Sequence, residues 1–158
     1  MRFRRILVPM DLSPSDAGAI RAGAEVAHGL RAALMLLWVV SKEGLEARGG
    51  EGGSTRPADL ICEELKREVL TQFDRVVRPE LRQELRVEPL VRVGVASELI
   101  LETAERIGAD VIVLAMPGHA SLDRMLRRRV FEQVIRQASC PVLAVPLPAA
   151  RSRRCTAA

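Results

Sequence analysis

The residues best suited to chemistry lie near the end of the chain, where Arg127, Arg128 and Arg129 follow a short apolar run. The planar guanidinium of arginine pairs well with phosphate because it presents parallel N–H donors. The cluster lies inside a strand–loop–helix–strand pattern, the usual carrier of phosphate sites in α/β proteins. That pattern comprises residues 110–115, 116–126, 130–137 and 141–145. The sequence therefore indicates a corner suited to binding an anion or a nucleotide.

Other reactive side chains show no catalytic arrangement. His28 has the position of a surface or boundary histidine, and His119, in the loop, is interpreted as solvated, with contact to a ligand as the alternative. Ser13 lies in no nucleophile elbow, and helix capping explains it. Cys140 precedes Pro141 at the start of a strand, where structural burial is expected. We therefore predict no catalytic residues and a binding or signalling module rather than an enzyme.

Composition excludes several classes of protein. Three of the 24 basic residues lie in the tail after residue 150, which leaves 21 basic against 20 acidic residues before it. This balance, together with the absence of tyrosine and the few other aromatic residues, argues against a nucleic-acid partner. The longest apolar run, residues 32–40, is far shorter than the roughly 20 residues that span a membrane. The three cysteines show no metal spacing, so we predict no metal site and a reducing, cytoplasmic location.

Alternating apolar runs and amphipathic segments predict the elements that position the arginines. Nearly continuous apolar strands are expected at residues 5–9, 33–40, 85–93, 110–115 and 141–145, with helices between them. Ser13 and Ser97 are the predicted helix caps, and Gly108 is the predicted C-terminal stop of the third helix. The helix over residues 59–84 should end or kink at Pro79. The order predicts an α/β fold, an open parallel sheet with helices on both faces.

Two segments interrupt this pattern. Residues 42–57 include a Gly-rich stretch without periodicity, and we predict a flexible loop there. Residues 147–158 contain arginine and proline but no core pattern, so they are expected to form a mobile basic tail. The predicted domain therefore covers residues 1–146.

Three segments together resemble the universal stress protein family. They are the opening residues 6–13 (ILVPMDLS), residues 93–100 (VGVASELI) and the closing residues 130–145 (VFEQVIRQASCPVLAV). The match runs in order from about Arg4 to Val145. The resemblance implies a Rossmann-like five-stranded parallel sheet of order 3-2-1-4-5 and a homodimer formed through the last strand.

The resemblance also implies where a nucleotide would bind. Many family members bind ATP through the pattern G-x2-G-x9-G-[ST], in which glycines let the backbone approach phosphate. Here the four positions carry Ala115, Gly118, Arg128 and Arg129, so one of the four survives. Asp11 matches the family position near the adenine. The site residues expected from this comparison are Pro9, Met10, Asp11, Val39, Val40, Ala115, Gly118, Arg128, Arg129 and Val130.

Two interpretations of these substitutions remain open. In the first, the ATP site is lost, because the Arg128 side chain fills space where only a hydrogen fits against phosphate. In the second, Arg124, Arg127, Arg128 and Arg129 replace backbone amides as donors to ATP, another nucleotide or another anion, in a sensor of the same fold. The arginines would otherwise point into water or pair with acids such as Asp123 and Glu132. An ATP-using enzyme with a related sheet is disfavoured because no phosphate loop follows the first strand.

The last strand is also a candidate interface. Val142, Leu143, Ala144 and Val145 would form an apolar sheet edge, and exposed edges invite pairing. Two copies pairing antiparallel would join two sheets by a symmetric contact. Protection of the edge by Pro141, Pro146 and the tail is the alternative. We predict a homodimer through this strand.

Overall fold

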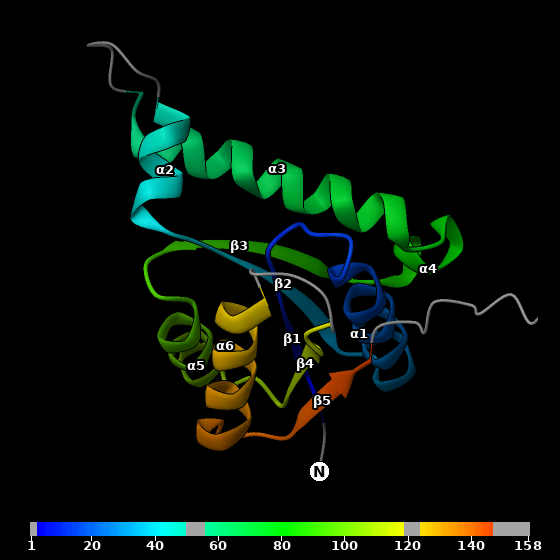
Figure 1. The fold of residues 1–158 in the computed structure, drawn as a ribbon. Coiled ribbons are helices and arrows are strands. Elements are labelled where there is room, and N and C mark those ends of the chain that lie inside the picture. The colour runs from blue at the N-terminus through cyan, green and yellow to red at the C-terminus, as the bar shows by residue number, and fades with distance from the viewer. Residues whose placement is uncertain (1–2, 50–55, 119–123, 147–158) are drawn as a thin grey trace, which may run out of the picture.

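The fold is an open parallel sheet, so the carboxyl ends of all its strands lie on the same side (Figure 1). The computed structural model describes residues 3–49, 56–118 and 124–146. Within these residues the strands are β1 (Arg5–Met10), β2 (Ala33–Val40), β3 (Val87–Val93), β4 (Val111–Ala115) and β5 (Val142–Val145). All strand pairs are parallel, and the order is β3-β2-β1-β4-β5. The predicted α/β class and the strand order 3-2-1-4-5 are confirmed.

Helices cover both faces of the sheet (Figure 1). One face carries α1 (Asp16–Leu30), α3 (Ala58–Val76) and the short α4 (Pro79–Glu84). The other face carries α5 (Ala96–Ile107) and α6 (Arg124–Gln137), while α2 (Lys42–Gly49) lies against α3. The chain folds this way because the strands β1, β2 and β4 are apolar on both faces and therefore need a helix layer on each side.

Side-chain alternation along β1 divides the core into two layers. Ile6 and Val8 are fully buried in the cluster with α1 and α3, whereas Leu7 is fully buried in the cluster with α5 and α6. This is the period of two that a strand imposes. The same strand thus packs against both helix layers, and Asp11 follows directly at its carboxyl end.

Gly23 lets α1 pack closely against β1. An added Cβ at Gly23 in α1 would lie 2.5 Å from Cγ2 of Val8 in β1. A second glycine, Gly108, ends α5 with φ of 62°, which confirms the predicted C-terminal stop.

The structure corrects the prediction for residues 42–57. Residues Lys42–Gly49 form the helix α2, whose Arg48 stacks over the Trp38 ring and pairs with Glu68 of α3. The flexible-loop prediction is therefore wrong for these residues. Helix α2 has a weak signal in the sequence, because none of its residues is fully buried and it carries no clear apolar face.

Helix boundaries differ from the predictions in ways that matter for the site. The helix predicted over residues 59–84 ends at Val76, and Pro79 begins α4, where a missing N–H costs nothing. Neither Ser13 nor Ser97 caps a helix: Ser15 and Val95 occupy the N-cap positions, without a side-chain bond.

The boundary difference that bears most directly on the site concerns α6. The helix begins at Arg124 rather than at Val130, so Arg127, Arg128 and Arg129 lie on the helix and not in the loop before it. The predictions for His119, Asp123 and the tail over residues 147–158 lie outside the described residues.

Candidate functional site

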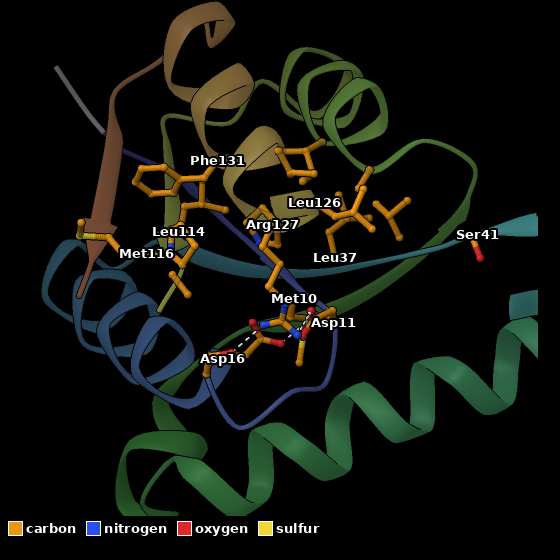
Figure 2. A pocket seen from close by; sticks show the side chains of 18 residues that line it. Met10, Asp11, Asp16, Leu37, Ser41, Leu114, Met116, Leu126, Arg127 and Phe131 are labelled. Atoms are coloured by element: carbon orange, nitrogen blue, oxygen red, sulfur yellow. Dashed lines mark hydrogen bonds and ion pairs between the residues drawn. The ribbon is translucent and has the colours of Figure 1, made fainter. Parts of the chain in front are cut away.

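A pocket of about 410 Å³ opens at the carboxyl ends of β1, β2 and β4 (Figure 2). Helices α5 and α6 form its other wall, and the first turn of α1 closes its polar end. The lining residues are Pro9, Met10, Asp11, Ser15, Asp16, Leu37, Val39, Ser41, Ala96, Ile100, Leu114, Ala115, Met116, Pro117, Leu126, Arg127, Val130 and Phe131. Parallel α/β sheets bind ligands at this edge, where the strand order reverses.

The structure brings six of the ten predicted site residues together around this pocket, namely Pro9, Met10, Asp11, Val39, Ala115 and Val130. The other four do not line it. Val40 is buried in the core cluster beneath α3, on the opposite face of the sheet. Arg128 is exposed and pairs with Glu132 one turn further along α6. Arg129 is also exposed, and Gly118, which follows β4, is half-buried. Pairing with Glu132 was among the sequence alternatives.

Arg127 is the arginine that enters the pocket (Figure 2). Its terminal nitrogen Nη2 lies 2.6 Å from Oδ2 of Asp11, and Nη1 donates to the hydroxyls of Ser13 and Ser15 at 2.9 and 2.7 Å. The two hydroxyls are themselves hydrogen bonded at 2.6 Å. Arg127 therefore ties the start of α6 to the β1–α1 loop.

From the sequence, Arg127 was expected in the arginine cluster but was not among the ten predicted site residues. A usable signal existed. Once the helix is extended back to Arg124, Arg127, Val130 and Phe131 fall at i, i+3 and i+4 and share one face. The apolar side of that face lines the pocket, so its arginine lines it too.

The β1–α1 loop folds around the carboxylate of Asp11. Its Oδ1 accepts the Ser13 amide at 2.9 Å, and Leu12 between them takes a left-handed conformation with φ of 65°. The Asp11 amide in turn donates to Oδ2 of Asp16 at 2.7 Å. Two carboxyl groups are thus held side by side at the polar end of the pocket.

The two carboxyl groups have opposite pKa shifts. Burial, and next to it the neighbouring negative charge of Asp11, raise the pKa of Asp16 to about 7. Burial acts in the same direction on Asp11, but hydrogen bonds from Asp16 and Ser13 and the charge of Arg127 outweigh it and lower the pKa of Asp11. A proton bound by the pair therefore resides on Asp16, and the ionised Asp11 pairs with Arg127.

Other candidate chemistry is limited in the part of the chain that the structure describes. No group of three His, Cys, Asp or Glu side chains is placed to hold a metal ion there. His28 is exposed, with Nδ1 3.3 Å from Glu84. Burial raises the pKa of the half-buried Cys140 thiol. No helix within the described ranges is long and apolar enough to cross a membrane.

Comparison with known proteins places this chain in one family. The chain matches the Universal stress protein family over residues 2–146. It is 32% identical over 148 residues to the Universal stress protein A homolog 1 of Coxiella burnetii, covering 92% of this chain and 97% of that one. A universal stress protein of Methanocaldococcus jannaschii is 30% identical over 146 residues, covering 92% and 84%. The chain belongs to the universal stress protein family.

Solved structures show the same fold at lower identity. A universal stress protein in complex with cAMP is 18% identical with a TM-score of 0.65, covering 92% of this chain and 98% of that chain. The universal stress protein from Archaeoglobus fulgidus in complex with dAMP is 20% identical with a TM-score of 0.60, covering 92% and 99%.

Proposed function

We propose that this protein is a non-catalytic, cytoplasmic stress-response module that does not bind ATP in the way the family pattern implies. The observation that carries the proposal is the Arg127–Asp11 ion pair inside the pocket. The carboxylate that matches the adenine-side position of the family is already engaged by a guanidinium of the same chain. A nucleotide entering by the usual route would have to displace it.

The phosphate side of the pocket also departs from the ATP pattern. Ala115 and Pro117 line it, so a methyl group stands at the first glycine position and the following loop lacks one amide donor. Arg128, at the third glycine position, points to solvent and pairs with Glu132. Its side chain therefore does not fill the phosphate space, and Arg127 replaces it as the physical reason for exclusion.

A second candidate function is a nucleotide- or anion-binding sensor whose ligand is held by arginine. It is supported by the position of Arg127 in the pocket and by the two related folds whose structures contain cAMP and dAMP. The exposure of Arg128 and Arg129 counts against a clamp made of several arginines. Among the arginines whose side chains the structure describes, Arg127 is the one that lines the pocket.

Titration calorimetry with ATP, ADP and AMP at low and physiological salt separates the two functions. We expect no heat of binding for any of the three with the unaltered protein. Micromolar binding that is lost in Arg127→Ala but kept in Arg128→Ala would establish the arginine-held sensor instead. The Arg128 variant is the matched control, because it removes the same charge one residue away and outside the pocket.

We further propose that the module is a homodimer paired through β5. This strand is an edge of the sheet, and its Leu143 side chain is 41% exposed, which is unfavourable for a lone apolar edge. Light scattering should give twice the chain mass, and Leu143→Glu should give a monomer. Leu60→Glu, on the exposed face of α3 over the opposite edge of the sheet, should leave the dimer intact. A monomeric unaltered protein would refute the pairing.

A further inference from the structure

Acidic side chains outnumber basic side chains at the polar end of the pocket. Among its lining residues, the charged side chains are Asp11, Asp16 and Arg127. We propose that this pocket binds a small organic cation, an apolar body with an ammonium or amidinium head that lies between the carboxylates of Asp11 and Asp16. The inference rests on the proposed function in one respect: both require that the pocket does not take ATP.

The protein already shows how this end of the pocket holds a planar cation. The Arg127 guanidinium binds one oxygen of Asp11 and donates to the hydroxyls of Ser13 and Ser15. In these contacts the guanidinium forms its ion pair with Asp11. An anionic ligand would have to take Arg127 from Asp11 and leave two carboxyl groups facing each other without it, which is costly in a partly buried site.

Asp16 is the carboxyl group that we expect to pair with the ligand. It is 5% exposed, and the charged groups facing it are Asp11 from the loop after β1 and Arg127 from α6. No ion pair among the described residues includes Asp16; its Oδ2 accepts the Asp11 amide. Below about pH 7 a proton neutralises Asp16, since burial and the charge of Asp11 raise its pKa to about 7. A ligand cation in the same place would release that proton and leave the Asp16 carboxylate paired with the ligand.

The remaining walls determine the body of the ligand. Leu37, Ile100, Leu114, Val130 and Phe131 give the cavity an aliphatic and aromatic lining next to the carboxyl pair. A volume of about 410 Å³ lies at the lower end of the range for small-molecule sites. It suits a single ring or a short aliphatic chain.

Three molecules of one shape test the charge preference, namely benzamidinium, benzamide and benzoate. Binding is followed by NMR of ¹³C-methyl methionine, because Met10 and Met116 line the pocket and Met35 does not. We expect benzamidinium to shift the Met10 and Met116 signals and leave Met35 unchanged. Its affinity should be at least about tenfold higher than that of benzamide, and benzoate should not bind. Equal binding of all three, no binding of benzamidinium, or preferred binding of benzoate would each overturn the inference.

Proton release gives a second readout that non-specific binding would not produce. With a pKa of about 7 for Asp16, benzamidinium should bind roughly tenfold more tightly at about pH 8 than at about pH 6. Asp16→Asn should abolish this pH dependence, whereas Glu98→Gln, an exposed acid outside the pocket, should retain it. A pH dependence that persists in Asp16→Asn would overturn the assignment.

An ATP titration run beside this series separates failure of the inference from failure of the proposed function. Absence of both ATP and benzamidinium binding overturns only the cation site. Binding of ATP that shifts the Met10 and Met116 signals overturns the proposed function and the cation site together.

Discussion

The buried carboxyl group of Asp16 makes a quantitative prediction about stability against pH. A folded-state pKa of about 7 lies above the ordinary value of 3.8, so the folded protein keeps a proton that the unfolded chain has lost. The free energy of unfolding therefore decreases as the pH rises between these two values. Asp16→Asn removes this dependence, because the amide resembles the protonated acid and its oxygen can still accept the Asp11 amide.

The magnitude follows from the part of the shift that lies inside an accessible pH range. From about pH 5 to about pH 7, a span of about two pH units, Asp16 is protonated in the folded protein and ionised in the unfolded chain. The free energy of unfolding falls by about 3 kcal/mol over this span. Asp11 does not contribute in this window, since its pKa is lowered from 3.8 and it is ionised throughout. The unaltered protein should therefore lose about 3 kcal/mol relative to Asp16→Asn on going from pH 5 to pH 8.

Urea denaturation of both proteins at the two pH values measures this double difference. Glu98→Gln is the matched control: it removes an exposed carboxylate, so its stability should follow the unaltered protein at both values. A difference between Asp16→Asn and the unaltered protein that stays constant within about 0.5 kcal/mol from pH 5 to pH 8 would refute a protonated Asp16.

Two further predictions concern the packing of α1 and α3 against the sheet. Gly23→Ala should destabilise the fold by about 1–3 kcal/mol in thermal or urea unfolding, because its Cβ would collide with Val8, whereas Gly29→Ala in the same helix meets nothing within 4 Å and should be neutral or slightly stabilising. Leu65→Ala should cost about 2–5 kcal/mol because Leu65 is fully buried on the core side of α3, while Leu60→Ala, at 57% exposure in the same helix, should change stability by less than about 1 kcal/mol. Equal costs within either pair would contradict the packing described.

The parallel sheet was predictable because apolar strands buried on both faces give a strong, local signal. The strand order was not contained in that signal and came from the family resemblance. Helix α2 was missed for a physical reason: it buries no side chain, and its contacts, such as Arg48 with Glu68, join residues 20 positions apart. Pro79 was correctly expected to interrupt the long helix, but a proline can begin a helix as well as end one.

The part of the pocket formed by strand ends could be predicted from the sequence. The polar end of the pocket could not be predicted. The strand-end residues Pro9, Met10, Asp11, Val39 and Ala115 follow from the sheet alone.

The polar contacts depend on how loops and helix ends meet. Arg127 reaches Ser13 and Ser15 across more than a hundred residues, and the left-handed Leu12 brings the Asp11 amide onto the Asp16 carboxyl. In the sequence, Asp16 has the ordinary position of an acid in the first turn of a helix. Burial next to a second acid gives it a different role, since it must keep a proton or find a cation. Asp11 thus engages the Arg127 guanidinium that a phosphate would need, and Asp16 beside it favours a proton or a bound cation.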